Sequence, residues 1–160
     1  MRKARLARVF ACLAAVGVML AVPVSGASAS DASIKTLFKS YSSKILIAEG
    51  HLATAIGEYK TSHNATPVEE ALSASTVVVH SLEVKIARQA AGAPRVKEGK
   101  SKIVKGLKTV IVAYGQLKAA FEAKTASSPE AAVEDAQKAE LAVKKGRKEL
   151  LEGVKLIVTR

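Results

Sequence analysis

Residues 95–121 read RVKEGKSKIVKGLKTVIVAYGQLKAAF, and from Ile103 onward the apolar side chains recur at alternating spacings of three and four. This is the period of one face of an α-helix, whereas a strand would alternate every second residue. A helix with one apolar face needs other elements to cover that face. The stretch therefore indicates a helix in an all-α domain. Its expected core positions are Val96, Ile103, Leu107, Val110, Tyr114, Leu117 and Phe121.

Three further segments show the same period. We expect one of these helices to begin at Thr66, with Pro67 in its first turn and Glu69 closing a capping box with Thr66. Asp31 is the expected N-cap of the first helix, and Ser128 precedes a proline as Thr66 does. The other expected core positions are Phe38, Tyr41, Ile45, Ala48, Leu52, Ala55, Tyr59, Leu72, Ser75, Val79, Leu82, Ile86, Ala132, Ala136, Ala139, Val143, Gly146, Leu150, Gly153 and Ile157.

Short connections join these segments, at residues 62–66, 91–94 and 124–128. Because short connections make neighbouring helices run in opposite directions, we predict an antiparallel up-down-up-down four-helix bundle built from two helical hairpins. Gly92 is the expected left-handed residue that ends the second helix. Two long hairpins that complete their core by dimerising fit the same narrow stripes, so a monomer and a homodimer both stay open.

Small residues mark the core stripe of the fourth helix, which predicts close approach of a neighbouring helix. A shift of 62 residues carries the stripe of the first helix onto that of the third, and Pro67 onto Pro129. A duplicated hairpin would produce this correspondence, and a shared heptad would produce most of it without common descent.

The first 29 residues have the pattern of a cleaved secretory signal peptide. Four basic residues and no acid precede an apolar run over residues 9–22, and residues 27–29 are the small-residue triplet that a signal peptidase recognises. The run is shorter than the ~20 apolar residues that cross a bilayer, so we expect cleavage after Ala29 and one mature domain over residues 30–160. Cys12 leaves with this leader, which removes disulfides, thiolate metal sites and cysteine nucleophiles from the mature chain.

Charge separates along the predicted bundle. The pole that holds the starts of the first and third helices carries 17 Lys and Arg residues against five Asp and Glu, whereas the other pole carries four against nine. A surface of one sign attracts polyanions, and the excess of Lys over Arg favours diffuse attraction to phosphate over bidentate recognition. The predicted polyanion-binding residues are Arg95, Lys97, Lys100, Lys102, Lys105, Lys108, Lys144, Lys145, Arg147 and Lys148.

Aromatic residues help to narrow the class of partner. All five aromatic residues of the predicted mature chain lie on core stripes, so none remains to stack on bases or sugars. Sequence-specific nucleic-acid recognition is therefore disfavoured. The expected partner is an anionic polymer of the cell envelope or an acidic lipid surface.

Catalytic and metal sites gain no support from the sequence. His51 and His80 stand at similar heights on adjacent predicted helices, but no third ligand accompanies them. Ser73 and Ser81 lack a glycine-flanked elbow, and every glycine stands alone, so neither a nucleophile elbow nor a phosphate loop is present. We therefore predict no catalytic residue, no metal and no cofactor.

These features predict a small, exported, non-catalytic binding protein of a bacterial cell envelope or the extracellular space, which docks on polyanions through its lysine-rich pole. One alternative is a carrier that holds a small molecule or haem in a cavity between helices. Another is a dimeric protein-interaction module. A secreted helical enzyme would need charged side chains that converge inside the bundle, and the stripes predict none there beyond Lys100.

Overall fold

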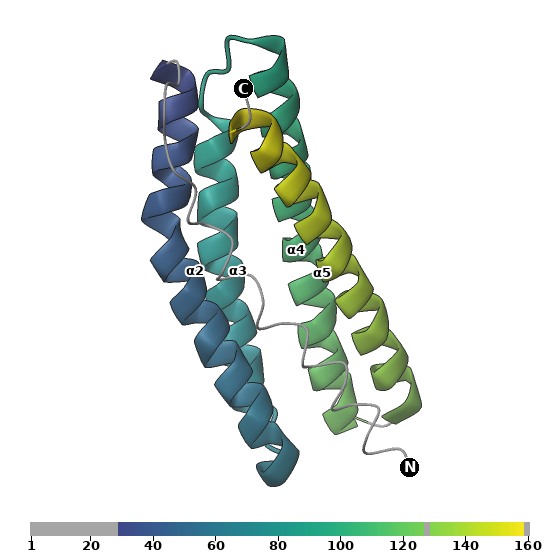
Figure 1. Cartoon of the computed structure of the whole chain (residues 1–160). Coiled ribbons are helices and arrows are strands. Elements are labelled where there is room, and N and C mark those ends of the chain that lie inside the picture. Colours follow the sequence, from purple (N-terminus) through teal and green to yellow (C-terminus); the bar gives the residue numbers. More distant parts are fainter. Residues whose placement is uncertain (1–28, 127–128, 159–160) are drawn as a thin grey trace.

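The computed structural model describes residues 29–126 and 129–158, and these are helical apart from two connections. The elements are α2 (Ala29–Ser62), α3 (Thr66–Ala87), α4 (Pro94–Ala126) and α5 (Pro129–Val158). Successive helices run in opposite directions, with α2 beside α3 and α4 beside α5 (Figure 1). The prediction of an all-α chain with four helices is thus confirmed. Residues 1–28 of the predicted leader lie outside the described residues.

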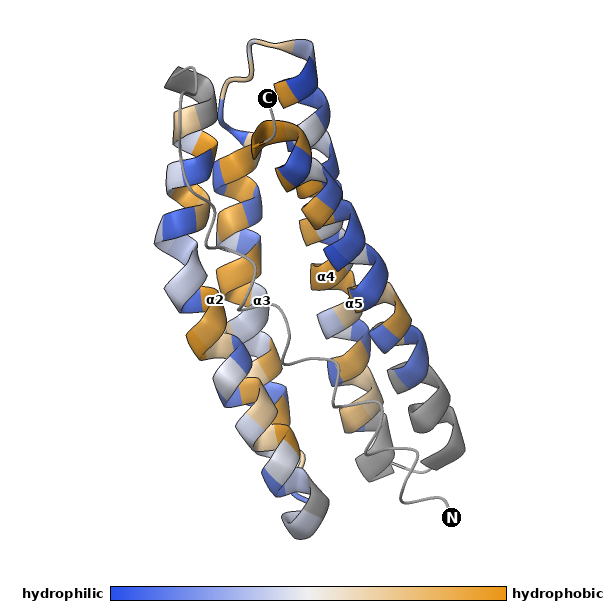
Figure 2. Cartoon of the chain, in the orientation of Figure 1, coloured by the Kyte–Doolittle hydropathy of each residue, from blue (hydrophilic) through white to orange (hydrophobic). Residues whose placement is uncertain are grey.

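The core lies where the helical stripes predict it. In α2, α3 and α4 every expected core residue is buried, including all five aromatic rings. In α5 the expected positions Ala139, Val143, Gly146, Gly153 and Ile157 are also buried and Leu150 is half-buried, whereas the side chains of Ala132 and Ala136 lie outside the described residues. The hydrophobic residues of α3 and α4 gather on the sides that face each other (Figure 2). Within the described ranges, no helix is both long and apolar enough to cross a bilayer.

The connection between α2 and α3 corrects the predicted capping box. The N-cap of α3 is Ala65, whose side chain makes no capping hydrogen bond, and the backbone N–H of Thr66 donates to Asn64 Oδ1 at 3.1 Å. The chain turns sharply here because His63 takes a left-handed conformation with φ of 54°. This turn brings the Asn64 side chain to the helix start, where the Thr66 hydroxyl was expected. Pro67 lies in the first turn of α3, as predicted.

The connection between α3 and α4 is longer than expected. Helix α3 ends at Ala87, and Arg88 keeps a right-handed conformation with its N–H bonded to the Val84 carbonyl. Gly92 is not left-handed, so the prediction that it ends the helix is wrong. The last carbonyls of α3 are already satisfied by the turn at Arg88 and Gln89, which leaves Gly92 in the open connection.

Helices α4 and α5 approach each other at glycines. A Cβ atom built on Gly106 would lie 2.5 Å from the Gly146 carbonyl oxygen, and one on Gly153 would lie 2.5 Å from the Gly99 carbonyl oxygen. The two glycine pairs are seven residues apart on each helix, in opposite directions. The predicted close packing of the small-residue row is therefore confirmed, because a side chain at these positions would collide with backbone.

Candidate functional site

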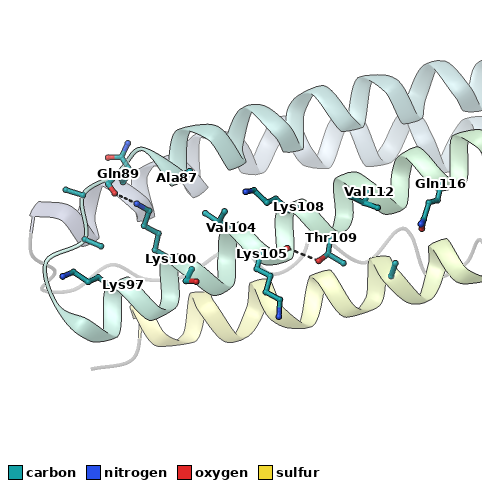
Figure 3. Close-up of a pocket in the computed structure, with 14 residues that line it drawn as sticks. Ala87, Gln89, Lys97, Lys100, Val104, Lys105, Lys108, Thr109, Val112 and Gln116 are labelled. Carbon is teal, nitrogen blue, oxygen red and sulfur yellow. Dashed lines mark hydrogen bonds between the residues drawn. The ribbon is translucent and has the colours of Figure 1, made fainter.

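A groove follows the outer side of α4, between the end of α3 and the neighbouring α5 (Figure 3). Its volume is about 960 Å³. Four of the predicted polyanion-binding residues line it because spacings of three to five residues place them along one side of the helix. The lining lysines are Lys97, Lys100, Lys105 and Lys108. Apolar side chains also line it, among them Val104, Val112 and Ala142.

Lys100 has a structural partner. Its Nζ donates a hydrogen bond of 2.6 Å to the Gln89 carbonyl, in the connection that follows α3 (Figure 3). The side chain is half-buried. Lys100 therefore ties this connection to α4, and its ammonium group is less available to a ligand than those of the exposed lysines.

Carboxylates accompany several of the other predicted residues. Lys105 Nζ lies 3.0 Å from Glu149 Oε1, and Lys108 Nζ lies 3.9 Å from Glu83 Oε1. These two lysine side chains remain 70% and 66% exposed. Their carboxylate partners are largely buried, with 17% of the Glu149 side chain and 8% of the Glu83 side chain exposed, so removing the lysines from them would leave buried carboxylates without a cation.

Lys102 and Lys144 are paired in the same way. Lys102 Nζ lies 3.6 Å from Glu98 and 3.4 Å from Glu152, so it joins α4 to α5. Lys144 Nζ lies 2.7 Å from Glu140, one turn earlier in α5. Carboxylates therefore offset part of the positive charge that the sequence places at this pole.

The most available charges are those of Lys97 on α4 and of Lys145 and Lys148 on α5. All three residues are exposed, and no acidic group within the described ranges lies within 4.0 Å of their ammonium groups. Arg95 is also exposed, in the first turn of α4. Together with Lys105 and Lys108, the three lysines form what we call the basic surface.

Arg147 lies apart from this surface. Its guanidinium points toward Glu49 of α2, with Nη2 3.7 Å from Oε1, and its side chain is only 17% exposed. Burial raises the pKa of Glu49 to about 7, although the positive charge of Arg147 opposes that shift. Burial, and then the charge of Glu49, raise the pKa of the nearby Tyr114 to about 12. Arg147 therefore serves to join the two hairpins through the interior.

Sequence reasoning missed the burial of Glu49 and Glu83. Both are nearly inaccessible to solvent, with 7% and 6% of their surface exposed. Each directly follows a core residue, Ala48 or Leu82, and thus lies at the edge of an apolar stripe. This position at the edge of a stripe was the one feature of the sequence that could have indicated their burial. The inward pair of Glu49 and Arg147 is the feature that an enzyme would need, but neither residue lines the groove.

Further positive charge surrounds Tyr41, between α2 and α3. Its hydroxyl lies 2.7 Å from Ser81 Oγ, and the ammonium groups of Lys44 and Lys85 lie 5.2 and 5.1 Å from the ring centroid. The pKa of Tyr41 is lowered, first by hydrogen bonding with Lys85 and then by the bond to Ser81. Cations over an aromatic face are attracted by its quadrupole, which explains how two lysines are held at one ring.

The histidines do not assemble a metal site in the part of the chain that the structure describes. His51 and His80 are both exposed, and His80 Nδ1 lies 3.5 Å from Glu83. No group of three or more His, Cys, Asp or Glu side chains among the described residues is arranged to hold a metal ion.

Comparison with known proteins found no relative of this chain. No family model matches the sequence, and neither the curated proteins nor the solved structures include a significant match. The site is therefore described by its own geometry, which is a row of exposed lysines beside a partly apolar groove on α4.

Proposed function

We propose that this chain is an exported, non-catalytic binding protein that docks on polyanions of the cell envelope or extracellular space through its basic surface. The observation that carries the proposal is that Lys97, Lys145 and Lys148 are exposed and have no acidic group of the described ranges within 4.0 Å of their ammonium groups. Export rests on the leader pattern of residues 1–29. Arg147 and Lys100 are not part of the basic surface, because the Arg147 side chain is paired with Glu49 and the Lys100 side chain is bonded to the Gln89 carbonyl.

Docking of this kind is electrostatic. A lysine ammonium is a compact point charge that suits phosphate and carboxylate groups without demanding one orientation. The ammonium groups of Lys105 and Lys108 are themselves exposed and can face an anionic surface while their largely buried partners, Glu149 and Glu83, stay in place. Salt screens the attraction over about 10 Å at 0.1 M, so binding falls as ionic strength rises.

Co-sedimentation with anionic and neutral vesicles and with wall-polymer beads, over a salt series, tests this proposal. The variant pairs Lys97→Gln with Lys145→Gln. The control pairs Lys118→Gln with Lys138→Gln, which removes equal charge from the same two helices at positions nearer the acidic end. Each lysine near an anionic surface contributes about 1 kcal/mol, so the first variant should bind roughly 30-fold more weakly. The control should bind nearly as well as the unmodified chain.

Two results would contradict the proposal. One is the absence of binding to every anionic surface even at low salt. The other is equal weakening in both variants, which would show that net charge, and not the basic surface, governs the attraction.

A further inference from the structure

Helix α3 carries a second stripe of residues, on the face opposite its core stripe. Alternating spacings of four and three residues place the members of this stripe on one face of the helix. They are Glu70, Ala74, Val77, Ser81, Val84 and Arg88, which we call the outer stripe. Val77 is the most exposed large hydrophobic residue of the described ranges, at 69%. The outer stripe thus has the period of a helix-packing face, yet it lies largely open to solvent.

The middle of the outer stripe can be covered by a partner at little cost. Ala74 and Val77 are exposed and Val84 is half-buried, so a partner here would remove apolar surface from water. Ser81 is the one polar residue in this part of the stripe, and its Oγ already lies 2.7 Å from the Tyr41 hydroxyl of α2. A partner helix would therefore leave no hydroxyl of the stripe without a hydrogen bond.

The two ends of the outer stripe carry opposite charges. Glu70 lies near the start of α3, and Arg88 follows the last residue of α3 in a right-handed conformation that continues the helix. Both residues are exposed, and neither has an oppositely charged group of the described ranges within 4.0 Å. They lie about 27 Å apart along the helix, at a rise of 1.5 Å per residue. A partner that covers the whole stripe must therefore offer a cation at one end and an anion at the other.

The outer stripe of a second copy meets this requirement when the two helices are antiparallel. The facing pairs between the copies are then Glu70 with Arg88, Ala74 with Val84, and Val77 with Ser81. One register makes all of these pairs, because the two residues of each pair lie equally far from the level of residue 79. A parallel arrangement would place Glu70 beside Glu70 and Arg88 beside Arg88, and a shift by one heptad in either direction would break the charge pairs. The stripe is therefore complementary to itself in one arrangement, that of a two-fold symmetric pair.

We infer that this face binds a second copy of the chain, through antiparallel α3 helices in which Glu70 of each copy pairs with Arg88 of the other. The contact is two-fold symmetric, so each charge pair occurs twice. It uses no residue of the basic surface, which lies on α4 and α5. With one helix from each copy, the contact is smaller than a standard interface of roughly 1,600 Å², so we expect a Kd on the order of 100 µM. In dilute solution the protein is then a monomer.

Sedimentation equilibrium of the purified protein, from about 10 µM to about 1 mM at physiological salt, tests the inference. We expect the average mass to rise from that of one chain toward that of two as the concentration increases. Arg88→Glu and Glu70→Arg should each weaken dimerisation about tenfold, because each turns two attractive pairs into two repulsive ones. Combining the two substitutions exchanges the signs and restores both pairs, so the double variant should dimerise within about threefold of the unmodified chain.

Two control variants separate the outer stripe from charge and hydrophobicity elsewhere. Lys145→Glu makes the same change of charge as Arg88→Glu at an exposed position of α5, and it should leave dimerisation unchanged. Val77→Asp should weaken dimerisation about tenfold, because it places a charge within the contact, whereas Val112→Asp, at a valine of α4 that is 59% exposed, should not. The helical circular dichroism of every variant should match that of the unmodified chain.

Three results would overturn the inference. The first is the mass of a single chain at every concentration, and the second is a dimer that Val77→Asp leaves unchanged. The third is a loss of dimerisation in the single charge variants that the double variant does not restore. Binding to anionic vesicles is measured separately with the dilute monomer, so each of these results leaves the test of the basic surface intact.

Discussion

At the scale of single residues, the interior is unusual in holding the charged pair of Glu49 and Arg147. Removing a carboxylate from water disfavours its ionised form, and here this effect outweighs the attraction of a guanidinium 3.7 Å away. Glu49 Oε2 accepts no hydrogen bond from any described residue. The pair therefore ties α2 to α5 at an energetic cost that depends on the protonation of Glu49.

We predict that Glu49 makes the fold more stable as pH falls from about 8 to about 5. Its pKa is raised from 4.5 to about 7 in the folded state, so between these values the native state binds a proton that the unfolded state lacks. The free energy of unfolding therefore rises on acidification, by about 2 kcal/mol through this group, and the gain is lost above pH 7. Urea denaturation at both pH values measures it.

Glu49→Gln should flatten this pH dependence, since an amide does not titrate. Glu58→Gln, which changes an exposed carboxylate on the same helix, serves as the control and should leave the slope as it is. The same pH slope in the unmodified chain and in Glu49→Gln would show that Glu49 is not the group responsible.

At the scale of the elements, the glycines of the second hairpin, α4 and α5, have a packing role that the glycines of α2 lack. Helices α4 and α5 meet through Gly99, Gly106, Gly146 and Gly153, with no side chain between the backbones. Gly50 and Gly57 of α2 and Gly115 of α4 have open space where a Cβ would lie. A glycine within a helix lowers helix stability by up to about 1 kcal/mol relative to alanine. Only at the four glycines between α4 and α5 is this cost offset by close packing of the two backbones.

Gly106→Ala should therefore destabilise the fold by about 2 kcal/mol. Its Cβ would meet the Gly146 carbonyl oxygen at 2.5 Å and the Leu150 nitrogen at 2.7 Å, so the helices must separate, which exceeds the gain in helix propensity. Gly115→Ala, in the same helix, should stabilise by up to about 1 kcal/mol. Thermal or urea unfolding compares the two. Stabilisation by both substitutions would rule out the close contact.

The apolar stripes predicted the four helices and their core because a period of 3.6 residues is a local property of the chain. The pairing of Gly106 with Gly146 could not be predicted from the stripes, because it depends on the register between two helices. The burial of Glu49 and Arg147 depends on how α2 and α5 rotate toward each other, which no stripe specifies. For the same reason the sequence could not separate the inward-facing Arg147 from the exposed Lys97 and Lys145, and all three were predicted as polyanion-binding residues.

The α2–α3 connection shows a different limit. Thr66, Pro67 and Glu69 match the pattern of a capping box, yet Asn64 bonds to the helix start in place of the threonine hydroxyl. The competing cap arises from the left-handed turn at His63, a conformation that non-glycine residues rarely adopt. Local motifs at helix ends are therefore decided by the turn that precedes them.

At the scale of the whole molecule, the antiparallel arrangement separates the charges. Lysines of all four helices lie toward the end at which α2 and α4 begin, whereas Glu58, Glu70 and Glu122 are exposed toward the other end. Helix α3 alone extends about 33 Å between these ends. This length is several times the distance over which salt screens charge, so the two ends respond separately to a charged surface.

The protein should consequently dock on an anionic membrane with the end at which α2 and α4 begin toward the lipid, tilted so that the basic surface on α4 and α5 also faces it. An environment-sensitive dye on Gly92→Cys reports on the connection between α3 and α4 at that end, and one on Asn64→Cys reports on the opposite end, both in a Cys12→Ser background so that only one thiol reacts. On anionic vesicles that carry a headgroup quencher, we expect strong quenching at residue 92 and little at residue 64, because the acidic end is repelled and remains beyond the Debye length. High salt should remove the quenching, and neutral vesicles should produce none. Equal quenching at both residues would mean that the chain lies flat on the membrane, in which case the separation of charge between its ends does not orient it.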